Sequence, residues 1–362
     1  MNIEALARPD IVAMKPYSSA RKEAPGQGIL LNANEAPRPL LTEPDAGAGL
    51  NRYPDPQPEQ LVSKLARLYR LPESRLLVTR GSDEGIDLLT RVFCRAGRDA
   101  ILHCPPTFGM YRIAAQTQGA EVISVPRSGD GAFKLDEQGI LDALRSNKRI
   151  RLVFLTSPNN PTGDVLDTAF LETLLEAASE QSLVIVDEAY AEFCSRPSAI
   201  TLLDRCENLV VLRTLSKAWA AAGLRCGTVL AQPSVIDLLR RVIAPYPLPS
   251  PVVGLALRML EPDMMTKQKE LLEQMAANKA YLLDDLSGRR FVRKLLPGEA
   301  NFVLLRTKNP EDLLEFCARR NVILRGFPAD PLLRDYVRIS VGSRADIDAL
   351  SAVLDEWEND HE

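Results

Sequence analysis

Between residues 75 and 231 the sequence alternates short apolar runs with longer amphipathic stretches. The apolar runs are rich in β-branched residues and bounded by turn residues, which is typical of buried strands. They read RLLVT (75–79), DAILHC (99–104), AEVISVP (120–126), RLVFLTS (151–157), SLVIVDEA (182–189), NLVVLRT (208–214) and CGTVLA (226–231). Helical stretches such as DEGIDLLTRVFCRA (83–96) and DTAFLETLLEAASEQS (167–182) lie between most of them. Strands that are apolar on both faces and alternate with helices predict an α/β fold, with a mostly parallel sheet covered by helices on both sides.

The 362 residues suffice for a large domain and a smaller one, at roughly 150 residues per domain. A long helical region is predicted from residue 251 to 287, and the tail after it has a different pattern. The tail interleaves predicted strands with predicted helices, the strands at 289–297, 300–307, 321–327 and 336–342 and the helices at 310–320 and 344–359. The first 60 residues are rich in proline and irregular. We therefore expect an N-terminal arm (1–45) packed on the small domain, a large domain (46–264) and a small C-terminal α+β domain (265–362).

Charge and rare residues exclude several classes of function. The formal net charge of −4 provides no basic surplus for nucleic acid or an anionic membrane. No apolar run approaches the ~18 residues of a membrane span, and no signal peptide is recognisable, so we expect a soluble cytoplasmic protein. The six cysteines are scattered without a CxxC pair, which indicates reduced thiols. The histidines are His103 and His361, so a histidine-ligated metal or a Ser-His-Asp hydrolase would depend on His103, and we expect no metal.

The stretch SLVIVDEAY (182–190) ends an apolar strand with two acids, Asp187 and Glu188. The carboxyl edge of such a sheet is where α/β folds bind their ligands. A buried carboxylate needs a partner, and the protonated ring nitrogen of a cofactor would supply one. A helix cap or a Mg²⁺ ligand is the alternative interpretation of these acids.

The stretch TRGSDEGIDLL (79–89) predicts a strand, a glycine turn and a helix that opens with Ser82 and Asp83. Free amide N–H groups at a helix start, together with the helix dipole, suit a phosphate group. An ordinary N-cap is the alternative. Neither GxGxxG nor GxxxxGK[ST] occurs, so binding of a dinucleotide or a nucleoside triphosphate finds no support.

A rigid turn, TSPNNPTG (156–163), follows the strand RLVFL. Asn159 and Asn160 stand between two prolines and offer amide groups at the same edge of the sheet. A purely structural turn is the alternative.

A single lysine, Lys217, stands in TLSKAWAAAGLRCG (214–227) with no acidic residue nearby in sequence. Burial among apolar groups disfavours an ammonium, and a neutral amine can form an imine with an aldehyde. Small neighbours indicate backbone close to a ligand, and Ser216 and Arg225 could bind the same anion as the helix start at 82–83. A solvated surface lysine is the alternative. Together the four motifs provide an imine-forming amine, a phosphate clamp and an acid for a ring nitrogen, which are the requirements for binding pyridoxal phosphate.

The order of PNNPTG (158–163), DEAY (187–190), SK (216–217) and GLRCG (223–227) resembles the fold-type I pyridoxal-phosphate-dependent aminotransferases, and the resemblance runs from Tyr17 to Arg344. Five longer stretches are similar, more narrowly, to the enterobacterial type of the histidinol-phosphate aminotransferase family. They are LNANEAP (31–37), NRYPDPQP (51–58), CPPTFGMY (104–111), RTLSKAWAAAGLRCG (213–227) and VIAPYPLPSPV (242–252).

The resemblance implies a contact with pyridoxal 5′-phosphate for each matching residue. Lys217 would bond to the aldehyde and move a proton at the substrate's Cα, while Asp187 would pair with the ring nitrogen. Asn160 and Tyr190 would hydrogen-bond the ring's phenolate oxygen. Phe108 would stack on the ring, where related enzymes often have tyrosine. The phosphate would be held by the backbone at Ser82 and Asp83 and by the side chains of Ser216 and Arg225.

The resemblance also implies the reaction and the assembly. Tyr53 would reach the phosphate of the neighbouring subunit's cofactor, which implies a homodimer, and Tyr17, Arg325 and Arg338 would contact the substrate's anionic group. We expect amino-group transfer between L-histidinol phosphate and 2-oxoglutarate, giving imidazole acetol phosphate and L-glutamate, in L-histidine biosynthesis. An aromatic aminotransferase, a threonine-phosphate decarboxylase or a silent ligand-sensing domain of the same fold are the rival hypotheses.

Overall fold

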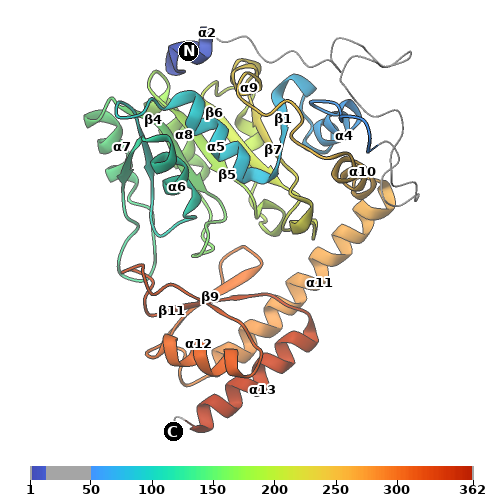
Figure 1. Ribbon diagram of the computed structural model, residues 1–362. Coiled ribbons are helices and arrows are strands. Elements are labelled where there is room, and N and C mark those ends of the chain that lie inside the picture. The colour runs from blue at the N-terminus through green and yellow to red at the C-terminus, as the bar shows by residue number, and fades with distance from the viewer. Residues whose placement is uncertain (1, 14–49, 361–362) are drawn as a thin grey trace.

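A computed structural model describes residues 2–13 and 50–360 and contains two separate sheets, each with its own helices (Figure 1). The larger body holds seven strands and the smaller body holds four. The long helix α11 (Pro262–Ser287) runs from one body to the other. The predicted boundary at 264/265 falls in the first turn of this helix, and we propose α11 as the division between the two domains.

The large sheet is mostly parallel, as predicted. Its strands lie in the order β1-β7-β6-β5-β4-β2-β3, and β7 alone runs antiparallel to its neighbours. The bounds are β1 (Leu76–Thr79), β2 (Ala100–His103), β3 (Glu121–Ser124), β4 (Ile150–Thr156), β5 (Leu183–Asp187), β6 (Leu209–Thr214) and β7 (Gly227–Ala231). Because β4, β5 and β6 are adjacent and parallel, the loops that follow them meet at one edge of the sheet.

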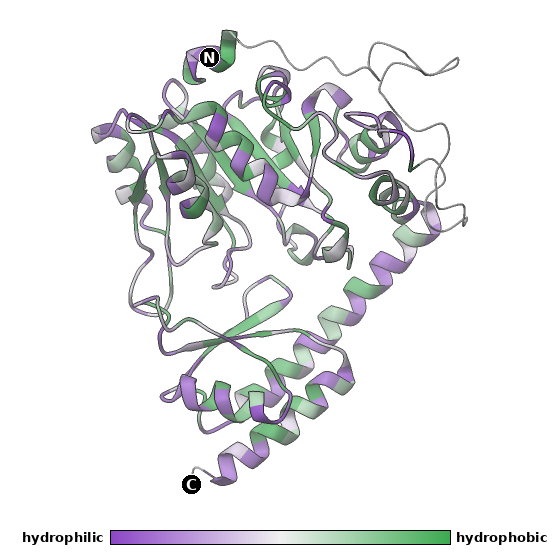
Figure 2. Ribbon diagram, viewed as in Figure 1, coloured by the Kyte–Doolittle hydropathy of each residue, from purple (hydrophilic) through white to green (hydrophobic). Residues whose placement is uncertain are grey.

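Helices cover both faces of this sheet, which explains why its strands are apolar on both sides (Figure 2). One face packs against α5 (Gly81–Phe93), α6 (Met110–Gln118) and α9 (Pro233–Arg240). The opposite face packs against α4 (Glu59–Tyr69), α7 (Glu137–Ser146), α8 (Thr168–Ala178) and α10 (Ser250–Met259). Single turns of 3₁₀-helix occur at Glu73–Arg75, Ala191–Phe193, Ala199–Leu202 and Ala222–Leu224. No helix of the described segments is long and apolar enough to span a membrane.

The small domain is an antiparallel sheet with helices on one side (Figure 1). Its strands lie in the order β10-β11-β9-β8, with bounds β8 (Lys294–Leu296), β9 (Phe302–Arg306), β10 (Arg325–Gly326) and β11 (Tyr336–Ser340). The end of α11 packs on this sheet together with α12 (Pro310–Arg319) and α13 (Arg344–Asp360).

The sequence prediction was wrong about three details of the C-terminal half. The strand predicted at 289–297 is only β8 (Lys294–Leu296), because Val292 N–H bonds back to Arg289 C=O at 3.2 Å in a turn. The strand predicted at 321–327 is reduced to β10, because Asn321 adopts a positive φ of 61° and Val322 N–H bonds back to Cys317 C=O at 3.0 Å. This turn uses the backbone groups that a strand would need. The helical region predicted at 251–287 is two helices, since Pro262 starts α11 after a break at Leu260 and Glu261.

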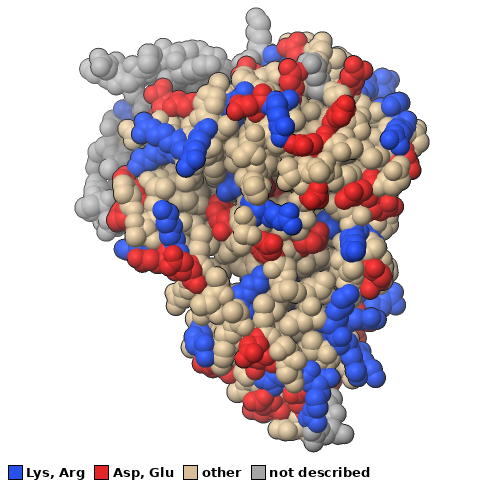
Figure 3. Space-filling model, turned by 180° about the vertical axis from the view of Figure 1, so that it is seen from behind, with Lys and Arg blue, Asp and Glu red and all other residues tan. Residues whose placement is uncertain are grey.

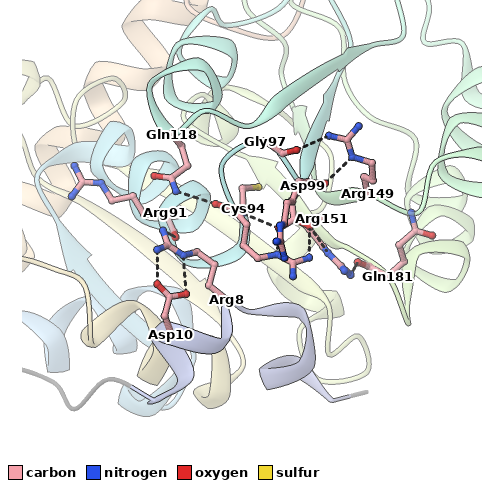
Figure 4. Close-up of polar contacts among 12 residues, drawn as sticks. Arg8, Asp10, Arg91, Cys94, Gly97, Asp99, Gln118, Arg149, Arg151 and Gln181 are labelled. Carbon is pink, nitrogen blue, oxygen red and sulfur yellow. Dashed lines mark hydrogen bonds and ion pairs between the residues drawn. The ribbon is translucent and has the colours of Figure 1, made fainter.

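The start of the chain packs on the large domain. Helices α1 (Ile3–Leu6) and α2 (Pro9–Ala13) bury their apolar residues against α5 and α9. Arg8 N–H donates to Val92 C=O at 2.9 Å, and the Arg8 side chain contacts Asp10 and the carbonyl of Arg91 (Figure 4). For residues 2–13 the packing on the small domain expected of the arm therefore does not occur, because α5 and α9 provide the apolar surface. Residues 14–45 lie outside the described residues.

The two domains touch through loops at the carboxyl edge of the large sheet. Gly163 and Gly298 meet backbone to backbone, and Glu299 N–H donates to Gly163 C=O at 2.7 Å. Nearby, the ring of Tyr190 packs edge-on against Phe302 with centroids 5.4 Å apart. The small domain therefore rests directly on the turn and the strand end that carry two of the sequence motifs.

Replacing Gly298 with alanine tests this contact. The added Cβ would lie 2.5 Å from the Cα of Gly163, and position 298 has a positive φ of 53°. We expect Gly298→Ala to lower the free energy of unfolding by about 1–3 kcal/mol, measured by denaturant titration. Gly288→Ala is the matched control, because its Cβ would meet its nearest atom at 3.7 Å and its φ is −83°. Equal stability of the two variants would contradict the tight contact.

Candidate active site

A cavity of about 570 Å³ lies at the carboxyl edge of the large sheet and is closed on one side by the small domain. Nine predicted residues line it from the large domain: Ser82, Asp83, Phe108, Asn160, Asp187, Tyr190, Ser216, Lys217 and Arg225. Arg325 and Arg338 line it from the small domain. The structure therefore brings residues from all four motifs and from both domains to one place.

Asp187 ends β5 at the floor of this cavity and is only 2% exposed. Burial raises the pKa of its carboxyl group to about 6, against the hydrogen bonds that favour its ionised form. These bonds come from the Tyr111 hydroxyl at 2.8 Å and from Ala189 N–H at 3.1 Å. A carboxylate held in this way is stabilised by a cationic ligand at its open side.

The neighbouring acid, Glu188, has a structural role. Its carboxylate accepts from Arg213 at 2.8 Å and from Ala199 N–H at 2.7 Å, and the Ser198 hydroxyl donates to it at 2.5 Å. Arg213 is itself buried, so the two charges compensate each other inside the protein. Of the two acids in the motif, Glu188 is committed to this network and Asp187 faces the cavity.

Metal-ligating side chains do not gather within the described part of the chain. No group of three or more His, Cys, Asp or Glu residues there could hold a metal ion. His103 ends β2, where burial lowers its pKa to about 4 and its Nε2 lies 2.9 Å from the Ser124 hydroxyl. This histidine belongs to the interior of the sheet and lies outside the cavity.

The start of α5 forms a cradle for an anion. Gly81 has a positive φ of 75°, and a Cβ on Gly227 would lie 2.6 Å from the backbone nitrogen of Ser82, so only glycine at 227 lets β7 pass this close. The N-cap residue is Arg80, so the side chains of Ser82 and Asp83 are not the caps that the alternative interpretation required. The first N–H groups of the helix therefore remain available to a ligand.

Arg225 completes this cradle from the opposite side. Its Nη1 donates to the Ser216 hydroxyl at 3.3 Å, and its Nη2 lies 3.2 Å from an Asp83 carboxylate oxygen. The guanidinium is half exposed, so it can reach an anion that enters the cavity. A phosphate group matches the geometry of a guanidinium and of helix N–H groups together.

Lys217 follows β6 and projects into the same cavity, with its Nζ 5.6 Å from the centre of the Tyr190 ring. Its pKa is lowered from the ordinary value, mainly by burial and then by the positive charge of Arg338. Within residues 2–13 and 50–360 it has no ion pair closer than 4.0 Å. The lysine is therefore held where it loses its proton more readily than a solvated lysine does, which suits a nucleophile.

Of the two asparagines of the turn, one stabilises the turn and the other faces the cavity. Asn159 is fully buried, donating to Pro106 C=O at 3.0 Å and to Thr162 Oγ1 at 2.7 Å. Asn160 faces the cavity, and its Oδ1 accepts from Arg338 Nη1 at 2.6 Å. The turn is thus both structural and part of the site.

The two arginines of the small domain lie directly opposite each other, on β10 and β11. Like charges at such a cross-strand position repel, so an anionic ligand between them would relieve that repulsion. Arg338 packs over Phe302 at 5.3 Å, and burial lowers its pKa. Arg325 is exposed.

One predicted residue, Tyr53, is not among the residues that line this cavity. Tyr53 is 50% exposed and stacks on Tyr246, with ring centroids 4.5 Å apart, away from the cavity lining. Tyr17 lies outside the described residues. Conversely, sequence reasoning missed Tyr111, which contacts Asp187 from α6. It stands in CPPTFGMY, but no local pattern there indicates which residue it contacts.

Comparison with known proteins places the chain in the family that its sequence motifs resemble. The chain matches the model of the family "Aminotransferase class I and II" over residues 27–354. A histidinol-phosphate aminotransferase of Cronobacter sakazakii is 42% identical over 354 residues, which is 97% of each chain. Histidinol-phosphate aminotransferase 1 of Haemophilus influenzae is 40% identical over 359 residues, covering 98% of this chain and 99% of the relative.

The fold is similar to a solved structure. The histidinol-phosphate aminotransferase from Sinorhizobium meliloti, solved in complex with pyridoxal-5′-phosphate, matches with a TM-score of 0.75. That match covers 84% of this chain and 82% of the other, at 24% sequence identity.

The lowered pKa of Lys217 can be tested on the free protein. A lysine with a lowered pKa is deprotonated, and hence reactive, at a lower pH than an exposed lysine. We expect the rate of acetylation of Lys217 by acetic anhydride, followed by peptide mass spectrometry, to level off at a lower pH than that of the lysine side chain in a short unstructured peptide. Identical pH profiles for the two lysines would contradict the proposed environment.

Proposed function

Because the chain belongs to the class I and II aminotransferase family, we propose that it transfers an amino group between L-histidinol phosphate and 2-oxoglutarate. The products are imidazole acetol phosphate and L-glutamate, in a cytoplasmic step of L-histidine biosynthesis. The full-length relatives carry the substrate assignment, since both are histidinol-phosphate aminotransferases. The convergence of Lys217, Asp187 and the arginines in one cavity is the observation that carries the chemistry.

The residues of the cavity fit pyridoxal 5′-phosphate as the cofactor. Lys217 provides an amine for the aldehyde, and Asp187 a buried acid for the ring nitrogen. Phe108 offers a ring face for stacking, while Asn160 and Tyr190 offer polar groups for the ring's oxygen. The phosphate would be held by the cradle of Ser82, Asp83, Ser216 and Arg225. When bound, pyridoxal phosphate supplies an electron-withdrawing ring that makes the proton on the substrate's Cα removable.

The protein's own side chains then control protons and charge. The Lys217 amine, with its lowered pKa, can take the proton from the Cα of the substrate that gives up its amino group, and can deliver a proton to the Cα of the keto acid that becomes the amino product. Asp187, ionised against a ring N–H⁺, keeps the positive charge on the ring. The closed side of the cavity, formed by the small domain, limits access of water to these groups.

Arg325 and Arg338 suit an enzyme that alternates between two substrates. Glutamate presents a carboxylate, whereas histidinol phosphate presents a phosphate. A guanidinium accepts either anion because its fork of N–H donors matches both geometries. The cross-strand pairing of the two arginines places both donors on one side of the cavity.

We also propose a homodimer in which Tyr53 reaches the cofactor phosphate of the partner subunit. Its half-exposed ring, held by stacking on Tyr246 at a surface outside its own chain's cavity, supports this role. Tyr17 is proposed as a further contact of the substrate's anionic group.

A substrate panel tests the assignment. The purified protein, saturated with pyridoxal phosphate, is assayed with L-histidinol phosphate, aromatic amino acids and threonine phosphate as separate substrates. We expect the highest kcat/KM with histidinol phosphate and 2-oxoglutarate. A preference for an aromatic amino acid, or carbon dioxide released from threonine phosphate, would assign the chain to one of the rival enzymes.

Removing the lysine should abolish turnover. Lys217→Ala leaves a folded protein without the amine that binds the aldehyde and moves the proton, so we expect kcat to fall by at least about 1,000-fold. Lys308→Ala, at an exposed position, is the control and should keep full activity. Substantial turnover by Lys217→Ala, measured as glutamate formed, would refute the catalytic role.

The two acids of the motif should respond differently to loss of charge. Asp187→Asn keeps the side-chain size but cannot stabilise a ring N–H⁺, so we expect kcat to fall by about 100-fold or more. Glu188→Gln removes one of the two ion pairs of buried Arg213, which keeps Glu192 at 2.9 Å, so we expect it to lower the free energy of unfolding by about 1–3 kcal/mol. Unchanged kcat in Asp187→Asn would remove Asp187 from the mechanism.

A further inference from the structure

Tyr111 lies directly behind the carboxylate of Asp187, on the side away from the cavity. It sits in the first turn of α6, is 0% exposed, and stacks on Phe154 with ring centroids 4.8 Å apart and planes 9° from parallel. Its hydroxyl oxygen is 2.8 Å from Asp187 Oδ2. Tyr111 is not among the residues that line the cavity, so it can affect a ligand only through its neighbours. Of these, Asp187, Thr156 and Phe108 line the cavity, and Asp187 is the charged one.

A chain of hydroxyl groups continues from Tyr111 away from the acid. The Tyr111 oxygen is 2.7 Å from Thr156 Oγ1, which in turn is 3.1 Å from Thr107 Oγ1. Thr107 donates to Asn159 Oδ1 at 2.7 Å, since the amide nitrogen of Asn159 is already used on other acceptors. Three hydroxyl groups thus connect Asp187 to a buried asparagine.

The hydrogen positions in this chain follow from its two ends. The hydrogen of Thr107 is committed to Asn159, so Thr107 can only accept from Thr156. Tyr111 has a choice between Thr156 and Asp187, and an ionised carboxylate is the stronger acceptor of the two. The hydroxyl of Tyr111 therefore points at Asp187 whenever that acid is charged.

We propose that Tyr111 is a positioning residue that aims the Asp187 carboxylate at the cavity and keeps it ionised for a cationic ring. The stacking on Phe154 holds the ring of Tyr111 in place, and the ring in turn sets the position of its hydroxyl group. With Oδ2 held by Tyr111 and Oδ1 held by Ala189 N–H, the carboxylate has one orientation. The inference rests on the proposed function for the identity of the cation, which is the cofactor's ring nitrogen.

The charges around Asp187 make this donor necessary. Burial raises its pKa, and the negative charges of Asp83 and Glu188 raise it further. Lys217 and Tyr190 also face the acid, and the Tyr111 hydroxyl and Ala189 N–H are the hydrogen bonds that lower its pKa. Tyr111 itself stays protonated, because burial and then the charge of Asp187 raise its pKa well above 10.0.

The direction in which loss of the Tyr111 donor shifts the binding affinity follows from these opposing effects on the pKa of Asp187. The free protein binds a ring N–H⁺ well only while Asp187 is ionised, so affinity is lost as the pH falls through the pKa of Asp187, about 6. Tyr111→Phe keeps the stacked ring but removes the donor, which raises that pKa. The loss of affinity should therefore begin at a higher pH in the variant.

The test measures binding of pyridoxamine 5′-phosphate to the full-length protein stripped of cofactor, by calorimetry between about pH 5 and pH 8. This probe carries the ring nitrogen but no aldehyde, so it does not bond to Lys217. We expect the midpoint of the affinity loss to rise by about one pH unit in Tyr111→Phe, which is about tenfold weaker binding near pH 5. Near pH 8, where Asp187 is ionised in both proteins, the affinities should agree within about twofold.

Tyr281→Phe is the matched control. It removes a tyrosine hydroxyl that donates to Asp348 at 2.8 Å in the small domain, and neither residue lines the cavity. Its affinity profile should overlay that of the unmodified protein. A shift of the same size in Tyr281→Phe would show that loss of any such bond moves the profile and would overturn the proposal.

A second variant should shift the midpoint of the affinity loss in the opposite direction. It can be measured even if Tyr111→Phe does not fold. A tyrosine fluorinated next to its hydroxyl, introduced at position 111, is a more acidic and therefore stronger donor. We expect the midpoint to move to lower pH in this protein. A purely structural role would not move the two variants in opposite directions, so an unshifted or raised midpoint refutes the positioning role.

Failure of this inference differs from failure of the proposed function. If the unmodified protein does not bind pyridoxamine phosphate at any pH, the proposed function itself is wrong and this inference fails with it. If the unmodified protein binds and transaminates but Tyr111→Phe titrates identically to it, only the role of Tyr111 is refuted.

Discussion

The site is organised around a carboxylate that the fold removes from water. Asp187 ends a central strand of the large sheet, where its charge is costly unless a cation faces it. The cavity above it carries three guanidinium groups, those of Arg225, Arg325 and Arg338, and the amine of Lys217. A ligand that is positive at one end and anionic at the other satisfies both requirements at once. Pyridoxal phosphate and its amino-acid substrates have this distribution of charge.

The small domain completes the cavity, so the site depends on the contact between the domains. That contact consists of the close approach of two glycine backbones, an edge-on pair of aromatic rings and the hydrogen bond from Arg338 to Asn160. Each involves a loop or a strand end that also carries a site residue. Charges of both signs are interspersed over the face of the molecule in Figure 3, so this face has no broad field of one sign.

Much of this could be predicted from the sequence, because the signals are local. Short β-branched runs ended by polar residues predicted the seven strands, and strand ends predicted where Asp187 and Lys217 would lie. The resemblance to aminotransferases read from these motifs is confirmed by the family match. The wrong prediction of a strand at 321–327 also has a local cause. A positive φ at Asn321 starts a turn that the apolar pattern does not reveal, and this turn shortens the strand.

The sequence by itself determined which residue types stand at the ends of which strands, since periodicity and turn chemistry act over a few residues. Only the tertiary structure decided between adjacent, chemically equal neighbours: Glu188 binds a buried arginine 25 residues away, while Asp187 turns to the cavity. It also brought Tyr111 to Asp187 across 76 residues of chain. Contacts of this kind depend on strand order and on how helices pack on the sheet, which no short stretch of sequence encodes.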